Sequence, residues 1–400
     1  MKIFRGDLQY PLMRKNFQNI GCSKSGIDII SSKLQNHTIF FENISLAKAL
    51  VLKQEMLVSG GDAALSESAI KGDSKKQDIY LTGSKRVFKR VATRLSEQGS
   101  WLNEERKVLE NLLYSTTQKM LFKVKERKFM SDKTYIMGIL NITPDSFSDG
   151  GKYDNLESAL VKAMELEEQG ADIIDIGGES SRPGAKEVSL EEEIHRVIPL
   201  IKKIREESKI PISIDTYKPE VARQAMEAGA DIINYIKGYS IDSKMLDVVE
   251  EHECPFVLMH MRGTPENMQQ KTDYNALMGD MISEITPVYD KLMDLLGNPG
   301  KIIIDPGIGF GKTVEDNWKI IKELQTLKVM GSPVLLGASR KSFIGKTFSI
   351  DNMHERDIIT SFISQFAIQS GVNFIRVHNV ELHKKLIETM IYMGVCDDRV

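Results

Sequence analysis

The sequence of 400 residues contains only three cysteines, which lie far apart at Cys22, Cys254 and Cys396. They form no Cys-x-x-Cys pair and no other spacing that is typical of zinc ligands. Small secreted domains held by disulfides are rich in cysteine, so this usage instead favours reduced thiols in a cytoplasmic protein.

Long apolar runs and a strong excess of one charge are also missing. No stretch of about 18 apolar residues occurs, the length that a membrane-spanning helix requires, and residues 1–16 contain no apolar segment typical of a signal peptide. The 53 basic and 56 acidic residues leave a net charge of −3, whereas nucleic-acid-binding domains usually present a strongly basic face. We therefore expect no membrane span and no nucleic-acid partner.

A chain of this length usually forms more than one domain, and residues 134–393 show one regular pattern. Eight nearly continuous apolar runs alternate with helical patterns, and such runs are typical of parallel strands buried on both faces. The predicted strands are Tyr135–Asn141, Ile173–Gly178, Pro211–Thr216, Ile232–Ile236, Phe256–His260, Ile302–Gly307, Val334–Ser339 and Phe374–Asn379. This repeat predicts an α/β fold with a (β/α)8 TIM barrel. A doubly wound sheet is the alternative, but it usually has fewer units and a glycine-rich first turn, which Asn141–Gly151 lacks.

Residues 1–130 show a different pattern, which predicts a small α/β domain of unknown role. Strands are expected at Thr38–Asn43 and Ile79–Thr82, and helices at Leu46–Leu57, Lys85–Gln98 and Asn103–Lys125. The charged run Lys123–Lys128, together with Ser131–Lys133, resembles a linker to the barrel. Gly60 and Gly61 are more typical of a helix end than of a ligand-binding loop.

Polar and charged side chains follow all eight predicted strands. The carboxyl ends of barrel strands meet at one rim, where such side chains can build a site. The first of these segments, Asn141–Gly151, holds two Asp, two Ser, one Thr, one Asn and a Gly pair. That composition suits a loop that covers a charged substrate.

Two carboxylates end apolar strands, at Asp215 and Asp305, and burying either one without a partner is costly. Together with Asn234, they suit a small ring whose edge carries several N–H donors. Each charge-assisted hydrogen bond of this kind contributes roughly 1.5–3 kcal/mol. Taken singly, either Asp is equally well explained as a strand-end cap or an ion pair.

Cationic side chains form a second group: Arg182, Lys341, Arg376 and His378. Arginine pairs bidentately with phosphate oxygens, and Asn141 could help to hold a Mg²⁺ that is shared with a diphosphate. Each Arg alone is more often part of a surface ion pair, and a lone His more often a satisfied core residue.

The segment Gly307–Thr313 superficially resembles a phosphate-binding P-loop. That motif requires an earlier Gly that is separated by four residues from its Gly-Lys pair, and Pro306 occupies the position. We therefore interpret Phe310 as a hydrophobic wall beside the site.

These strand-end segments resemble those of the dihydropteroate synthases over residues 134–393. The matching segments, in the family's order, are Asn141–Gly151, Glu179–Gly184, Asp305–Lys312, Ser339–Ser342 and Arg376–His378. The resemblance implies a barrel enzyme that condenses 6-hydroxymethyl-7,8-dihydropterin diphosphate with 4-aminobenzoate, with Mg²⁺ as cofactor. It also implies a homodimer, and competition by sulfonamides at the aminobenzoate site.

Residue roles follow from the same resemblance. It implies that the pterin is held by Asp215, Asn234, Asp305 and Lys341. It implies that the diphosphate is held by Asn141, Arg182, Arg376 and His378, with Asn141 also near the metal. It implies an aminobenzoate site bordered by Ser181, Pro183, Phe310, Lys341 and Ser342. The loops implied to close over both substrates contribute Thr143, Asp145, Ser146, Phe147, Ser181, Arg182 and Pro183.

The sequence departs from the family at Tyr235, where an Asp usually follows the strand-end Asn234. Two other functions therefore stay in view. A pterin-binding methyltransferase that serves a corrinoid would share Asp215 and Asn234 but would not need the cationic group. A pterin-binding protein without turnover would fit the Tyr235 departure.

Overall fold

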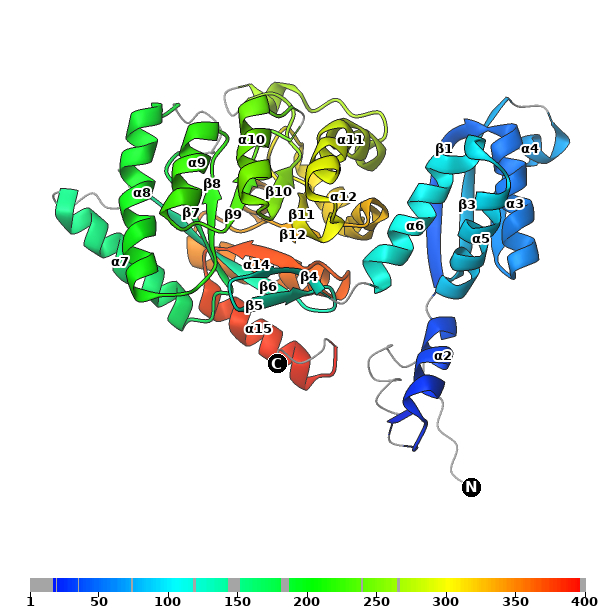
Figure 1. The fold of residues 1–400 in the computed structure, drawn as a ribbon, viewed down its shortest axis with the longest axis horizontal. Coiled ribbons are helices and arrows are strands. Elements are labelled where there is room, and N and C mark those ends of the chain that lie inside the picture. The colour runs from blue at the N-terminus through cyan, green and yellow to red at the C-terminus, as the bar shows by residue number, and fades with distance from the viewer. Residues whose placement is uncertain are drawn as a thin grey trace. The chain divides into compact units, whose positions relative to one another are not determined.

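The computed structural model describes residues 17–18, 20–34, 36–72, 75–117, 120–142, 152–180, 187–238, 240–264 and 267–395. The chain divides into two compact units, one made mainly of residues up to Thr117 and the other mainly of residues from Gln118 onward. Figure 1 labels the elements of both units. No helix among these residues is long and apolar enough to cross a membrane.

The first unit is a three-stranded antiparallel sheet with helices packed on one face. The strands β1 (Asn36–Ser45), β3 (Lys76–Ser84) and β2 (Asp62–Leu65) lie in that order. The helices are α2 (Lys24–Leu34), α3 (Leu46–Ser59), α4 (Glu67–Lys71), α5 (Lys85–Glu97) and α6 (Asn103–Thr117), with a 3-10 turn at Ser100–Leu102. Strand residues alternate, so Ile79 and Leu81 of β3 face the helices while Tyr80 is exposed.

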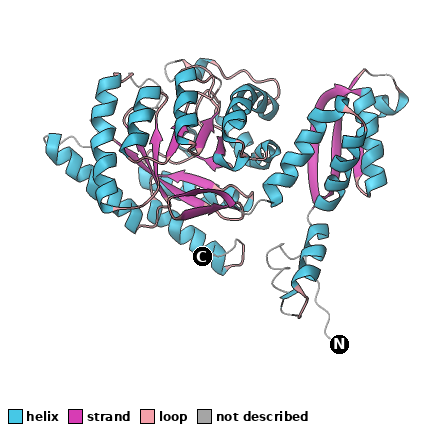
Figure 2. Ribbon diagram, viewed as in Figure 1, coloured by secondary structure: helices cyan, strands magenta, loops and turns pink. Residues whose placement is uncertain are grey.

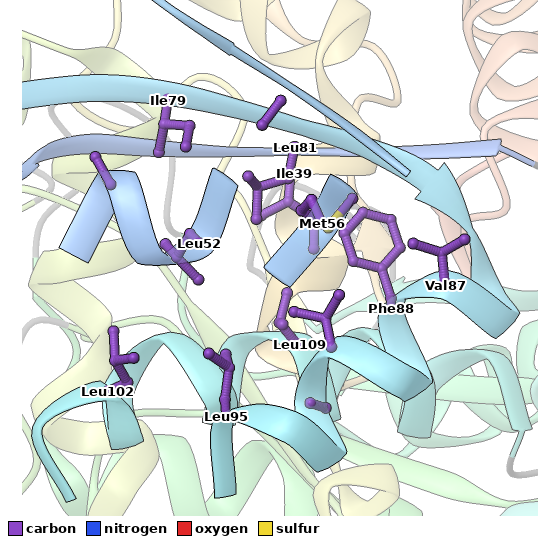
Figure 3. Packing of buried hydrophobic residues seen from close by; sticks show 14 residues of the cluster. Ile39, Leu52, Met56, Ile79, Leu81, Val87, Phe88, Leu95, Leu102 and Leu109 are labelled. Atoms are coloured by element: carbon purple, nitrogen blue, oxygen red, sulfur yellow. The ribbon is translucent and has the colours of Figure 1, made fainter. Parts of the chain in front are cut away.

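The core of this unit lies between the sheet and helices α3 and α5. Leu52 and Met56 of α3 and Phe88 and Leu95 of α5 are fully or almost fully buried, and Figure 3 shows them packed beside the strand residues. The expected α/β character of the region is therefore confirmed.

The glycine pair after α3 ends the helix, as its composition predicts. Gly60 adopts φ 88°, a left-handed conformation, and the backbone N–H groups here bond to the carbonyls of Leu57 and Met56. A Cβ on Gly61 would lie 2.5 Å from Met56 Cε, so the second position has no space for a side chain.

The prediction of one helix over Asn103–Lys125 is wrong. Helix α6 ends at Thr117, and β4 (Met120–Val124) pairs with β5 (Arg127–Met130) as an antiparallel hairpin. The run Lys123–Lys128 is therefore not a linker, because it forms the turn of this hairpin and the adjoining ends of its two strands.

Aromatic side chains of this hairpin belong to the core of the second unit. Phe122 and Phe129 stack with ring centroids 4.7 Å apart, and both approach Phe374 at the start of a barrel strand. They pack with residues at the amino ends of the other strands, such as Tyr135 and Ile173. The hairpin thus covers the end of the barrel opposite the predicted site.

The second unit is a closed barrel of eight parallel strands surrounded by helices (Figure 2). The strands are β6 (Tyr135–Asn141), β7 (Ile173–Gly177), β8 (Ile212–Asp215), β9 (Ile232–Tyr235), β10 (Phe256–Met259), β11 (Ile302–Asp305), β12 (Leu335–Leu336) and β13 (Phe374–Val377). The sheet order runs from β11 back to β6 and continues to β13 and β12. A parallel bridge between Ile304 and Val334 joins the two edges, so the predicted barrel is confirmed over the doubly wound alternative.

Helices follow the strands as the repeat predicts, and they bury their apolar faces against the barrel. They are α7 (Lys152–Glu168), α8 (Leu190–Glu207), α9 (Pro219–Ala228), α10 (Ser243–His252), α11 (Leu277–Leu296), α12 (Val314–Lys322), α13 (Ser342–Phe348), α14 (Met353–Gln369) and α15 (Val380–Tyr392). Shorter 3-10 segments lie at Met268–Gln270, Pro299–Lys301 and Leu324–Met330.

Candidate active site

A polar pocket lies at the carboxyl ends of the barrel strands. Its lining residues are Asp215, Asn234, Ile236, Met259, Asp305, Gly307, Ile308, Phe310, Gly337, Lys341 and Arg376. All four predicted pterin ligands are therefore brought together, although they come from β8, β9, β11 and the start of α13. Phe310, predicted as a hydrophobic wall, lines the same pocket.

Arg376 bridges two carboxylates at the base of this pocket. Its Nε donates to Asp175 Oδ2 at 2.6 Å, and its Nη2 donates to Asp215 Oδ2 at 2.7 Å. Asp175 is fully buried within β7. An ion pair at this depth is stable only when its geometry is good and its remaining polar atoms are bonded.

Asn234 completes that network from β9, the next-but-one strand from β7. Its Nδ2 donates to both carboxylate oxygens of Asp175, at 3.2 and 3.3 Å. The side-chain amide nitrogen is thereby turned away from a ligand, which leaves Oδ1 as the amide atom that can accept a hydrogen bond in the pocket.

Burial and the neighbouring charges shift the pKa values of Asp215 and Arg376. Desolvation raises the pKa of Asp215 to about 7, although the charge of Arg376 opposes the rise. For Arg376, burial acts to lower the pKa, but the charges of Asp175 and Asp215 outweigh it and the pKa is raised above its ordinary value. The guanidinium is therefore permanently charged, whereas Asp215 exchanges its proton near neutrality.

Asp305 lies on the opposite side of the pocket and is almost fully buried. Its Oδ1 accepts the backbone N–H of Gly307 at 2.7 Å, and a Cβ on Gly337 would lie 3.6 Å from its Oδ2. Burial raises its pKa, while the Gly307 N–H and the charge of Lys341 act in the opposite direction. The free side of this carboxyl suits an N–H donor on a ligand.

Lys341 and Phe310 meet at the edge of the pocket. The Nζ of Lys341 lies 3.9 Å from the ring centroid of Phe310, which is a cation–π contact. Ser342 follows Lys341 as the first residue of α13. A shared position of Lys341, between the pterin and the aminobenzoate, stays a prediction.

His378 lies beyond the pocket lining, at the end of β13. Its backbone N–H donates to Ser339 Oγ at 3.2 Å, and the same hydroxyl lies 2.9 Å from His378 Nδ1. The Ser339 hydroxyl thus holds both the backbone and the ring of His378, and the tautomer of the ring decides which of the two side chains donates.

Asn141 ends β6 and is partly exposed. Its Oδ1 lies 3.4 Å from the place that a Cβ on Gly177 would take, an ordinary contact distance that puts the amide beside the end of β7. No cluster of three or more His, Cys, Asp or Glu that could hold a metal occurs among the described residues. A metal at Asn141 would thus depend on substrate oxygens and water for most of its ligands.

Seven predicted site residues lie outside the described residues. They are Thr143, Asp145, Ser146, Phe147, Ser181, Arg182 and Pro183.

The sequence reasoning missed Asp175, because it searched only the residues at and after each strand end. A single Asp within the apolar run Ile173–Gly177 was a signal, since a buried carboxylate in a strand requires a partner. It also missed a cluster beside the rim. Lys218 Nζ bonds Glu179 at 2.5 Å and Glu193 at 2.6 Å, and the Tyr217 hydroxyl contacts Glu179 at 3.1 Å.

Tyr235 does not enter this network. Its hydroxyl donates to the carbonyl of Ser240 at 3.0 Å, and its ring packs 5.5 Å from that of Phe256. The carboxylate that orients Asn234 is supplied by Asp175, so the Tyr235 departure leaves the amide held.

Comparison with known proteins identifies the family of the barrel. A family model described as pterin-binding enzyme matches residues 137–378. The dihydropteroate synthase of Synechocystis is 49% identical over 253 residues, which cover 62% of this chain and 86% of that protein. A crystal structure of dihydropteroate synthase from Clostridium difficile, obtained in the presence of pteroic acid, is 40% identical with a TM-score of 0.61 and covers 66% of this chain and 97% of that one.

One relative also matches residues upstream of the barrel. A probable bifunctional folylpolyglutamate synthase/dihydropteroate synthase of Halobacterium salinarum is 36% identical over 346 residues, covering 86% of this chain and 41% of its own length. A match of that length exceeds the barrel region, so part of the first unit has a counterpart in that relative. The barrel, its pocket and these matches assign the chain to the pterin-binding enzyme family, where it belongs to the dihydropteroate synthases.

Proposed function

We propose that this chain condenses 6-hydroxymethyl-7,8-dihydropterin diphosphate with 4-aminobenzoate, which gives 7,8-dihydropteroate and diphosphate. The observation that carries the proposal is the convergence of Asp215, Asn234, Asp305 and Lys341 on one pocket at the barrel rim. Four ligands with three kinds of polar group suit a flat heterocycle that has donors on one edge and acceptors on another.

In this proposal each residue has a distinct task toward the pterin. Asp305 and the ionised form of Asp215 accept hydrogen bonds from ring N–H groups, and Asn234 Oδ1 accepts a third. Lys341 donates from Nζ to a ring oxygen or nitrogen, and its charge favours the departure of an anionic group nearby. Arg376 positions Asp215 through the 2.7 Å contact and is close enough to the pocket to help bind the diphosphate.

The chemistry requires no strong base. The C–O bond to the diphosphate breaks, the pterin ring delocalises the positive charge that develops, and the neutral amine of 4-aminobenzoate donates its electron pair to the carbon. The amine then loses a proton to solvent or to the departing diphosphate. The protein therefore acts mainly by positioning the two substrates and by stabilising the leaving anion.

Residues for the second substrate lie on the side of Phe310. We place the aminobenzoate ring between Phe310, Lys341 and Ser342, with Ser181 and Pro183 contributed by the second loop. Sulfonamides, which share the shape of 4-aminobenzoate, would compete there. Thr143, Asp145, Ser146 and Phe147 of the first loop, with Arg182, would help to exclude water, which would otherwise capture the electrophilic carbon.

The proposed cofactor is Mg²⁺ at Asn141. The neutral oxygen of an Asn and the absence of a carboxylate cluster among the described residues fit an ion that takes most of its ligands from phosphate and water. When bound, Mg²⁺ would neutralise charge on the diphosphate. Arg182, Arg376 and His378 would hold the remaining phosphate oxygens.

The deciding experiment measures diphosphate release by the purified chain. Release that requires both 4-aminobenzoate and Mg²⁺ is expected. Pterin binding without release would instead support a binding protein that lacks turnover. Methyl transfer from a folate to a corrinoid, without diphosphate release, would support the methyltransferase alternative.

We also propose a cytoplasmic homodimer that associates through α14. Ile358, Phe362 and Phe366 lie four residues apart on this helix and are 38, 61 and 43% exposed. Residues spaced by four form a stripe along one helix face, and an exposed apolar stripe of this kind is typical of an interface between protein subunits.

A further inference from the structure

Lys312 is a buried cation that the proposed reaction does not use. Only 3% of its surface is exposed, and its side chain points back into the loop that follows β11. Burial lowers the pKa of Lys312 to about 7, although the charges of Asp305 and Glu284 oppose the change. A Met or Leu would fill such a position without this electrostatic cost, so the amine has a specific task.

The amine is held by three acceptors, all of them uncharged groups among the described residues. Nζ lies 3.0 Å from the carbonyl oxygen of Phe310, 3.0 Å from Nδ1 of His260 and 3.4 Å from the carbonyl oxygen of His260. Protonated or neutral, the amine has at least two N–H donors, enough for the two shorter contacts. These bonds tie the β11 loop to the end of β10.

The protonation state of His260 leaves its ring able to accept a hydrogen bond from Lys312. Burial, with the adjacent charge of Lys312, lowers the pKa of His260 to about 4, so its ring is neutral. Its Nε2 lies 2.9 Å from Glu284 Oε2 and donates there, which leaves Nδ1 as an acceptor. Arg262 donates from Nε to the same carboxylate at 2.9 Å. The hydrogen bond from His260 Nε2 to Glu284 of α11 therefore fixes Nδ1 as the acceptor that faces Lys312, and Arg262 holds the same carboxylate.

The loop itself needs such an anchor. Gly307, Gly309 and Gly311 all have positive φ angles, at 65°, 85° and 63°, and such residues have the greatest backbone freedom in the unfolded chain. Phe310 lies between two of them, and its carbonyl accepts the shorter of the two carbonyl contacts that Lys312 makes. Its ring packs with Met259 and other residues of a small apolar cluster that lines the pocket.

We propose that Lys312 is a positioning residue for the second substrate, because its amine holds the backbone of Phe310 and so fixes the ring that forms one wall of the aminobenzoate site. Lys312 touches neither substrate. Its action passes through the Phe310 carbonyl and through the cation–π contact between Phe310 and Lys341. The inference rests on the proposed function, which places 4-aminobenzoate against Phe310.

The test compares Lys312→Met with Phe310→Ala and with the double variant. In Lys312→Met the Michaelis constant for 4-aminobenzoate is expected to rise by roughly tenfold, the effect of losing one or two buried hydrogen bonds. The dissociation constant for the pterin diphosphate should change by a much smaller factor. The double variant should bind aminobenzoate no worse than Phe310→Ala, since the lysine acts only through that residue.

Three controls separate positioning from a general loss of structure. Lys319→Met, at an exposed position on the next helix, should behave like the unaltered chain. Lys312→Gln, which keeps an N–H donor, should restore part of the aminobenzoate binding, and it replaces Lys312→Met if that variant does not fold. Thermal unfolding and circular dichroism of each variant establish that a fold is present.

Three results would each overturn the inference. They are an unchanged Michaelis constant in Lys312→Met, additive effects in the double variant, and equal losses of affinity for both substrates. Absence of turnover in the unaltered chain would count against the proposed function as well. Normal turnover with an unchanged Michaelis constant in Lys312→Met would count against the lysine alone.

Discussion

Asn234 donates its side-chain amide to the fully buried carboxylate of Asp175, 3.2 Å away on the next-but-one strand. The same carboxylate accepts Arg376 Nε at 2.6 Å. Asp175 therefore orients the side-chain amide of Asn234 and the guanidinium of Arg376, and both of these residues line the pocket. It takes the orienting role that sequence comparison would have assigned to an acidic residue at the position of Tyr235.

We first predict that Asp175→Asn weakens pterin binding although Asp175 does not line the pocket. Loss of the charge leaves Arg376 with one carboxylate and removes a bond to Asn234. Breaking a buried ion pair typically costs about 3–5 kcal/mol, and part of that cost should appear in the binding free energy measured by calorimetry. The exposed Glu250→Gln is the matched control. Unchanged affinity in a folded Asp175→Asn protein would contradict the orienting role.

A second prediction concerns Asp305, which is proposed to bind the ring directly. Asp305→Ala should reduce the affinity for pterin diphosphate by about 1.5–3 kcal/mol, the contribution of a charged hydrogen bond. The change leaves the buried Gly307 N–H without its acceptor, so thermal unfolding of the variant is measured beside its affinity. Equal affinity for the variant and the unaltered chain would mean that the pterin binds elsewhere.

Pterin affinity should also depend on pH through Asp215. Its pKa is raised to about 7 mainly by burial, so a neutral carboxyl predominates below that value and accepts hydrogen bonds more weakly. Binding should therefore strengthen from about pH 6 to about pH 8, and Asp215→Asn should remove this part of the pH dependence. Comparison of the two proteins cancels the ionisation of the ligand itself.

The third prediction has a second readout, because the raised pKa of Asp215 also makes the free energy of unfolding depend on pH. Because the folded pKa lies above the unfolded value of 3.8, the folded state binds the proton more tightly. The resulting stabilisation is full below the unfolded pKa and is lost as the pH rises through about 7. The free energy of unfolding of the unaltered chain, relative to that of Asp215→Asn, should therefore fall across this window. A flat difference would show that Asp215 titrates normally.

The proposed dimer gives a fourth prediction. Replacing Phe362 and Phe366 by Glu places two charges in the middle of the exposed stripe on α14, where burial in an interface would be strongly unfavourable. The double variant should be monomeric by light scattering, while the unaltered chain is dimeric. Tyr392→Glu, at the end of α15 and 94% exposed, provides a control at another exposed aromatic residue. Equal masses for all three proteins would exclude α14 as the interface.

The barrel and most of its pocket could be predicted because both leave strong local signals. Strands buried on two faces read as continuous apolar runs, and Asp215, Asn234 and Asp305 interrupt those runs at their ends. Asp175 was not predicted because it lies inside its strand, and its role follows only from its contacts with Arg376 and Asn234. Those contacts join β7 to β13 and β9, and no local pattern encodes them.

The β4–β5 hairpin was predicted wrongly, as a helix, for a similar reason. Its charged residues continue the amphipathic pattern of α6, so the local sequence favours helix through Lys125. The strand conformation is stabilised by packing of Phe122 and Phe129 against Phe374, a residue about 250 positions away. Tertiary contacts of this kind override local preference, and they also explain why the linker was placed in the wrong segment.

The hairpin leads to a fifth prediction, which concerns where the first unit can be removed. A chain that begins at Gln118 keeps β4 and β5, whereas one that begins at Ser131 loses Phe122 and Phe129, which are 3 and 0% exposed. Removing one buried Phe side chain typically costs about 3–5 kcal/mol, so the shorter chain should unfold at much lower temperature or fail to fold. The longer one should retain the barrel, as judged by thermal unfolding and pterin binding. Equal stability of the two truncated chains would show that the hairpin is dispensable to the barrel, and the aromatic contacts at Phe374 would then contribute little.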